Sequence, residues 1–148
     1  MSALDERALA DDGGCFACGR HNPQGLGMRV RLEDGQAHCL LTLPPQFQGW
    51  AGIAHGGIVC TILDEIMAHA VIHFIGQGVT TSMETTFRQP VPLGAEITAR
   101  GWVVQRRGRL AQSAAELRLT QGETLLAQAQ ARWLIKLGPD GQPLPRLG

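Results

Sequence analysis

The sequence lacks any excess of positive charge, since 13 lysines and arginines are matched by 13 aspartates and glutamates over 148 residues. Proteins that bind nucleic acids usually carry a clear basic surplus. The balance therefore argues against a nucleic acid as the main partner. Tyrosine is absent and aromatic residues make up only 5%, so the core must be mainly aliphatic.

Long uninterrupted apolar runs are also missing. Four ionisable residues interrupt the most apolar stretch, residues 58–75: Asp64, Glu65, His69 and His73. The stretch therefore falls short of the roughly 20 apolar residues that cross a bilayer. Residues 1–14 are polar and acidic, without the apolar region of a secretion signal. We expect a soluble, cytoplasmic protein with no membrane span, in which the four cysteines are free thiols.

Turn residues divide the chain into one α+β domain at 15–137 and flexible tails at 1–14 and 138–148. Asp34-Gly35 between two extended segments predicts a hairpin. No helix breaker occurs from 57 to 76, and the apolar residues there cover nearly every face, which is typical of a buried helix. Four segments with strand-like composition follow, at 79–87, 95–105, 110–120 and 124–137. The pattern predicts a mostly antiparallel sheet wrapped around one long helix.

Two adjacent carboxylates, Asp64 and Glu65, lie in the middle of the expected helix. Burying a carboxylate is costly without partners, so a carboxylate here indicates either a functional site or an ordinary salt bridge at a surface. The two side chains point about 100° apart around the helix. Only one of them is therefore expected to face a given site.

His55-Gly56-Gly57 marks the start of the same helix. Backbone N–H groups at a helix start can stabilise a negative charge, although a tight turn needs the same small residues. Gly56 and Asp64 are eight residues apart, which corresponds to roughly 12 Å along a helix. One reacting carbonyl cannot meet both groups within one chain. If both act on one substrate, two protomers must share the site.

The ordered motifs HGGIVCTILDEIMAHA, TTSMETTFRQPVPLG, RRGRL and TLLAQAQARWLIKL resemble those of hotdog-fold acyl-CoA thioesterases, in particular the PaaI-like branch. The resemblance covers about residues 15–137. It implies a hotdog fold in which Asp64, nine positions after His55, is the nucleophile or general base. It also implies that the Gly56 N–H is the oxyanion donor, that Thr80 positions the reacting group and that His55 belongs to the catalytic set.

The resemblance further implies coenzyme A contacts from Thr86 and Arg88 and from the turn that holds Arg107 and Arg109. Gly57 and Gln48 are additional candidates for holding substrate. Residues 88–109 contain five arginines against one glutamate, and the arginine fork suits phosphate oxygens. The neutral total therefore contains one local basic region.

A thioester carries a good leaving group, so its hydrolysis needs a polarised carbonyl and an activated water or carboxylate. We therefore expect no cofactor and no catalytic metal. The resemblance implies an acyl-CoA as substrate, and the spacing of Gly56 and Asp64 implies a homodimer or homotetramer. Two alternatives stay open: a non-catalytic acyl-CoA-binding hotdog protein and a hotdog dehydratase.

Cys15-Phe16-Ala17-Cys18 is half of a zinc site, and no second C-x-x-C follows. His21, or His38 with Cys39, could complete it in principle. Structural thiols are the simpler interpretation, with zinc and redox activity as alternatives. Glu65, His69 and His73 form a separate helical stripe, too long for one ion to touch all three.

Overall fold

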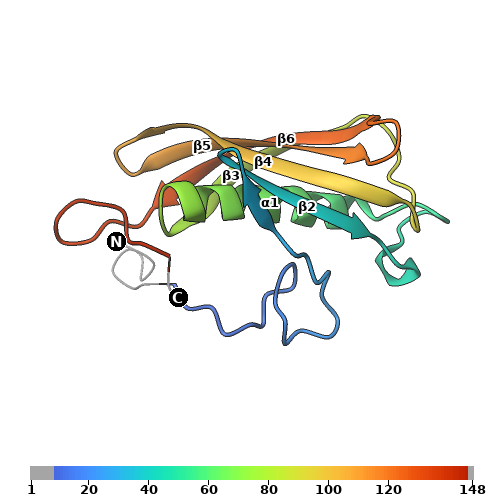
Figure 1. The fold of residues 1–148 in the computed structure, drawn as a ribbon, viewed down its shortest axis with the longest axis horizontal. Helices are drawn as coiled ribbons and strands as arrows, with labels where there is room; N and C mark the ends of the chain where they lie inside the picture. Colours follow the sequence, from blue (N-terminus) through green and yellow to red (C-terminus); the bar gives the residue numbers. More distant parts are fainter. Residues whose placement is uncertain (1–8, 147–148) are drawn as a thin grey trace.

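Six antiparallel strands form one curved sheet that wraps around a single helix in the computed structural model, which describes residues 9–146 (Figure 1). The sheet order is β1-β2-β4-β5-β6-β3. Its strands are β1 (Arg31–Glu33), β2 (Gln36–Thr42), β3 (Gly78–Phe87), β4 (Glu96–Arg107), β5 (Leu110–Leu119) and β6 (Leu125–Ile135). The helix is α1 (Gly56–Phe74), and a short 3-10 helix, η1 (Pro45–Phe47), precedes it. The α+β prediction is confirmed.

Local turn chemistry sets the strand boundaries. Asp34 and Gly35 join β1 to β2 with positive φ values of 52° and 73°, as a two-residue type I′ hairpin requires. β3 begins directly after Gly76 and Gln77, and it returns to the far side of the sheet to pair with β6. β3 is therefore one of the two edge strands.

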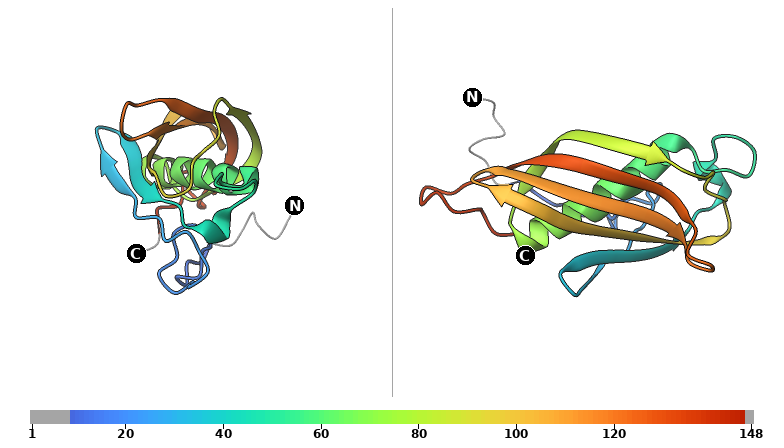
Figure 2. Two further views of the ribbon diagram at one scale, coloured as in Figure 1. Left: turned by 90° about the vertical axis from the view of Figure 1, so that its right-hand side faces the viewer. Right: turned by 90° about the horizontal axis from the view of Figure 1, so that it is seen from above.

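α1 lies in the concave face of the sheet (Figure 2). Gly101, in the middle of β4, permits the close approach, because a Cβ there would lie 2.7 Å from the carbonyl oxygen of Ile66. Small alanines on β5 and β6 line the same inner face. The apolar side of the helix is fully covered by this packing: Val59, Ile62, Leu63, Ile66, Met67, Ala70 and Val71.

By length and composition, α1 would also be able to cross a membrane. One such helix is weak evidence, because the core helix of a soluble protein meets the same criteria. Its packing against the sheet accounts for the apolar residues on its buried side. The cytoplasmic location stays a prediction.

The segment before β1 covers α1 on the side away from the sheet (Figure 1). It has no regular secondary structure but is held by its own turns, in which Leu26 N–H donates to the Phe16 carbonyl and Met28 N–H to the Ala17 carbonyl, both at 2.8 Å. Ala17 and Met28 are buried. This segment is a folded lead-in to the sheet.

The chain beyond β6 also folds back on the domain. Leu144 N–H donates to the Lys136 carbonyl and Gln77 N–H to the Leu144 carbonyl, each at 2.8 Å. The described part of the expected tail at 138–148 is therefore tied to the start of β3. Most of the expected tail at 1–14, namely residues 1–8, lies outside the described residues, as do residues 147–148.

Candidate active site

Asp64 and Thr80 meet where the middle of α1 passes the start of β3. The Thr80 hydroxyl donates a hydrogen bond of 2.8 Å to Asp64 Oδ1. Asp64 is half-buried and Thr80 is exposed. Burial raises the pKa of Asp64 above its ordinary value, the neighbouring Glu65 charge acts in the same direction, and the Thr80 hydrogen bond opposes them. A carboxylate with a raised pKa is a stronger base at neutral pH.

Glu65 points to a different part of the molecule. Its Oε1 lies 3.4 Å from His69 Nε2, and both of its oxygens lie 3.8 Å from Cys15 Sγ. Burial alone would raise the pKa of Glu65, but hydrogen bonds from His69 and Cys18, together with the His69 charge, lower it. Of the two adjacent carboxylates, Asp64 has the raised pKa expected of a base, and it faces Thr80 at the start of β3.

The start of α1 presents one free backbone donor. His55 is the N-cap, and its Nδ1 accepts a hydrogen bond of 2.9 Å from Gly57 N–H. Ile58 and Val59 donate to the His55 carbonyl. Within residues 9–146, the Gly56 N–H has no acceptor, and Gly56 is exposed. The structure therefore assigns His55 and Gly57 to capping, and it leaves the Gly56 N–H open at the positive end of the helix dipole.

The arginines implied as coenzyme A contacts lie at two different ends of the sheet. Arg88 follows the end of β3, where its N–H donates to the Leu126 carbonyl at 2.8 Å. Arg107 lies at the β4–β5 turn and lines a cavity with Thr81, near the start of β3. The Arg109 carbonyl accepts from Ile135 N–H at 2.7 Å in the same region. Ten strand residues separate these ends, or about 33 Å in extended chain.

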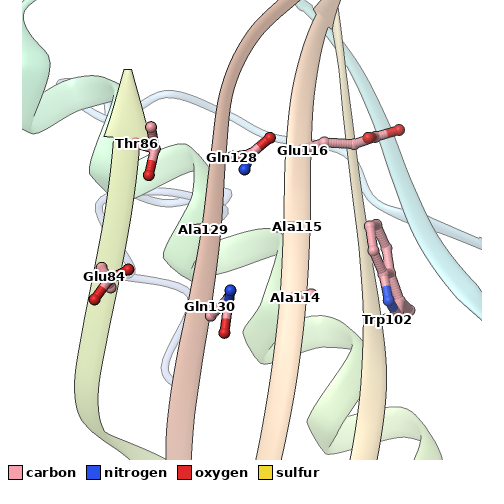
Figure 3. A pocket seen from close by; sticks show the side chains of 9 residues that line it. All are labelled: Glu84, Thr86, Trp102, Ala114, Ala115, Glu116, Gln128, Ala129 and Gln130. Carbon is pink, nitrogen blue, oxygen red and sulfur yellow. The ribbon is translucent and has the colours of Figure 1, made fainter. Parts of the chain in front are cut away.

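Thr86 lies on the outer face of the sheet, with α1 behind the strands (Figure 3). It lines a shallow pocket with Glu84, Trp102, Glu116 and the glutamines of β6. Glu116 accepts hydrogen bonds from Arg100 at 2.7 Å and from Arg118 at 3.1 Å. The Thr86 side chain is therefore on the opposite face of the sheet from Asp64.

Gln48 belongs to the loop before the helix. Its Oε1 accepts from Gly52 N–H at 2.9 Å and closes this loop. Within the part of the chain that the structure describes, no hydrogen bond joins Gln48 to Asp64 or Thr80. In this chain the Gln48 side-chain oxygen is engaged in holding the loop that leads to His55.

A model of the thioesterase superfamily matches residues 51–127, which is just over half of the chain. The match begins before His55 and continues into β6, so it contains Gly56, Asp64, Thr80 and all the arginines of the basic region. The chain belongs to the thioesterase superfamily.

Relatives of this thioesterase-superfamily chain include the acyl-coenzyme A thioesterase THEM4 of Rattus norvegicus, 29% identical over 121 residues. The alignment covers 79% of this chain and 52% of THEM4, so the chain spans about half the length of that relative. Among solved structures, the Escherichia coli PaaI protein has a TM-score of 0.70 at 19% identity, over 80% of this chain and 83% of PaaI. The Streptococcus mutans protein smu.793 bound to acetyl CoA has a TM-score of 0.70 at 17% identity, over 80% of this chain and 91% of smu.793.

These similarities confirm the hotdog fold and the resemblance to the thioesterase family. They do not assign roles to individual residues, which rest on the geometry described above. One cluster was missed by the sequence analysis, the group formed by Glu65 with Cys15 and Cys18. No local pattern indicates it, because 50 residues separate Cys15 from Glu65 and the contact exists only in the folded chain.

Proposed function

We propose that this thioesterase-superfamily protein hydrolyses an acyl-CoA to the free acid and coenzyme A, with Asp64 as general base or nucleophile and the Gly56 N–H as oxyanion donor. The observation that carries the proposal is the half-buried Asp64 carboxylate, oriented by Thr80 and with a raised pKa. The names of THEM4 and of the acetyl-CoA complex support the substrate class.

The active site is completed by two protomers in this proposal. Asp64 lies beside the start of β3, whereas a Cβ at Gly56 would lie 3.7 Å from the Phe87 ring, at the end of β3. β3 is an edge strand, and an unpaired strand edge favours pairing with another chain. Antiparallel pairing of two β3 strands would set the start of one against the end of the other. Gly56 of one protomer would then approach Asp64 of its partner.

The same pairing unites the basic residues. Arg88 at the end of one β3 would lie near Arg107 and Arg109 beside the start of the other. Arginine forks from two protomers are suited to the few phosphates of one coenzyme A. We therefore propose a homodimer as the catalytic unit, which could assemble further into a tetramer.

Two chemical routes are open to Asp64. As a base, it accepts a proton from water while the water oxygen attacks the thioester carbonyl, and the Gly56 N–H stabilises the developing oxyanion. As a nucleophile, it attacks the carbonyl itself to give a mixed anhydride, which water then cleaves. Both routes expel the coenzyme A thiolate and need no metal or cofactor in the chemical step.

The test is hydrolysis of a panel of aryl-CoA and fatty acyl-CoA thioesters by the wild type and two alanine variants. Asp64→Ala should lose at least about a hundredfold in kcat, whereas Glu65→Ala should keep most of its activity. Full activity in Asp64→Ala with loss in Glu65→Ala would overturn the residue assignment. Tight binding of acyl-CoA without turnover by the wild type would instead favour a binding protein.

A further inference from the structure

The side chains of Cys15, Cys18 and Glu65 converge on one point beneath α1. The two Sγ atoms and a carboxylate oxygen all lie within 4.8 Å of one another. Within residues 9–146, this is the only group of three or more His, Cys, Asp or Glu donors that close together. The cysteines lie outside the residues matched by the superfamily model, and Asp64 catalysis does not use the cluster.

The spacing is close to that of a tetrahedral metal site. With Zn–S bonds of about 2.3 Å, two tetrahedral sulfur ligands lie about 3.8 Å apart. Cys15 Sγ is already 3.8 Å from both oxygens of Glu65. Contraction by about 1 Å or less would therefore bring all three donors onto one ion.

The chemistry of the donor atoms indicates which metal the cluster would bind. Two thiolates disfavour magnesium and calcium, which prefer oxygen ligands, and favour zinc over them. The charges also fit, because one divalent cation balances most of the charge of two thiolates and a carboxylate. Binding would release the two thiol protons to solvent.

The C-x-x-C turn is closely packed at Gly19, the residue after the second cysteine. Gly19 N–H donates to the Cys15 carbonyl at 2.8 Å. A Cβ at Gly19 would lie 2.4 Å from both the Cys15 nitrogen and the Gly13 carbonyl oxygen, so only glycine fits. The backbone of the turn therefore holds Cys15 and Cys18 on one side of α1, where their sulfurs and a Glu65 oxygen lie within 4.8 Å of one another.

His69 supports the third ligand. Its Nε2 lies 3.4 Å from Glu65 Oε1, and both side chains are largely buried, with exposed fractions of 19% and 13%. A histidine on a ligating carboxylate orients that carboxylate as an outer-shell partner. The position left open by the three protein donors suits a water molecule.

We infer that Cys15, Cys18 and Glu65 bind one zinc ion, which fastens the irregular segment before β1 to the middle of α1. The segment is otherwise attached through apolar contacts: Ala17 and Met28 are buried, Leu26 and Val30 pack against the core, and Phe16 makes an edge-to-face contact with Phe47 at 6.2 Å. The metal therefore has a structural role. It is attached to the residue next to Asp64 but faces away from the site of hydrolysis.

The experiment measures metal directly and does not depend on hydrolysis. The full chain is purified without a histidine tag, its zinc content is determined by mass spectrometry, and the metal-free protein is titrated with cobalt(II). The wild type should hold about one zinc per chain, and cobalt should give a thiolate-to-metal charge-transfer band. The Cys15→Ser/Cys18→Ser double variant should lose both signals.

Three single variants sharpen the assignment. Cys60→Ser is the matched control, because Cys60 is a half-buried thiol on α1 that contacts Thr85, and it should bind zinc normally. Glu65→Gln should weaken zinc binding at least about tenfold, and His69→Ala about tenfold with the charge-transfer band retained.

The wild-type protein alone keeps the test decisive if the double variant fails to fold. Zinc should protect Cys15 and Cys18, but not Cys60, from alkylation, as read by peptide mass spectrometry. Three outcomes would overturn the inference: wild-type zinc content below about 0.1 per chain after zinc addition, alkylation unaffected by zinc, or a Cys15–Cys18 disulfide as the stable form.

Discussion

The hydroxyl of Thr80 donates to Asp64 Oδ1 across 2.8 Å and ties the start of β3 to the middle of α1. The bond fixes the direction of the carboxylate and lowers its pKa against the larger effect of burial. Within residues 9–146, the second carboxylate oxygen accepts no hydrogen bond from a neighbouring side chain, so it is the oxygen available to a water or a thioester carbon.

Removing this hydroxyl should change the pH dependence of hydrolysis. In Thr80→Val the carboxylate loses a bond that favours its ionised form, so the pKa of Asp64 should rise further. A hydrogen bond to a charged group is worth about 1.5 kcal/mol, which corresponds to about one pH unit. The acid limb of the kcat/KM profile should move to higher pH by that amount, and Thr80→Ser should restore it. If the acid limb of the kcat/KM profile does not move in Thr80→Val, Asp64 is not the group whose titration controls the rate.

The oxyanion role of Gly56 can be tested by replacing it with proline, which has no backbone N–H. Proline is tolerated at the first position of a helix, and His55 has φ −59° and ψ 138°, a conformation suited to a residue before proline. Gly56→Pro should therefore fold and lose about 10²–10³ in kcat, the usual effect of losing one oxyanion donor. Gly56→Ala keeps the N–H, its Cβ meets Phe87 at an ordinary 3.7 Å, and it should stay within about tenfold of wild type. Equal activity of the two variants would argue against the role.

The two adjacent carboxylates should affect stability in opposite directions. The pKa of Asp64 is raised in the folded state, so its ionised form opposes folding at neutral pH. Asp64→Asn should increase the free energy of unfolding at pH 7 by about 0.5–2 kcal/mol. This gain should shrink as the pH falls through the raised pKa toward about 4, where the wild type also becomes neutral.

Glu65→Gln is the contrasting measurement in metal-free protein. The pKa of Glu65 is lowered, so its ionised form stabilises the fold above the ordinary glutamate range. The variant should be less stable than wild type at pH 7, and the difference should vanish as the pH falls through the lowered pKa. Denaturant unfolding across this range checks both signs, and the same sign for both variants would contradict the assignments.

The contact of α1 with the sheet depends on Gly101. Gly101→Ala would place a methyl group 2.7 Å from the Ile66 carbonyl oxygen, which is backbone and cannot rotate away. The helix must shift, so we expect a loss of about 1–3 kcal/mol in the free energy of unfolding. Thermal or urea unfolding measures it, with Gly56→Ala as the stability control. An unchanged free energy of unfolding in Gly101→Ala would mean that α1 lies farther from β4 than the 2.7 Å approach implies.

The order of the elements could be predicted from the sequence because local signals dominate it. Asp34-Gly35 determines one turn, and glycines near 76, 94, 108 and 122 separate the helix and the later strands. The helix predicted at 57–76 is observed at Gly56–Phe74. Its apolar faces also predicted that the sheet would wrap around it.

The candidate site was less predictable because its contacts cross the chain. The helical spacing predicts that Asp64 and Glu65 point in different directions. Only the fold shows that Asp64 lies beside Thr80 and that Glu65 lies beside Cys15. The sequence also could not show that the Gly57 N–H is occupied by His55 while the Gly56 N–H is open. The position of Thr86 on the outer face of the sheet, away from Asp64, is also visible only in the folded chain.

Hybrid dimers test most directly whether Gly56 of one protomer and Asp64 of the other act on the same thioester. Asp64→Asn and Gly56→Pro chains carrying different tags are co-expressed, and the heterodimer is isolated by two affinity steps. With sites shared between protomers, one site of the heterodimer carries both substitutions and the other carries neither. The account predicts about half of the wild-type turnover per dimer, far above either parent variant. A heterodimer as inactive as its two parents would contradict it, because each site would then lie within one chain.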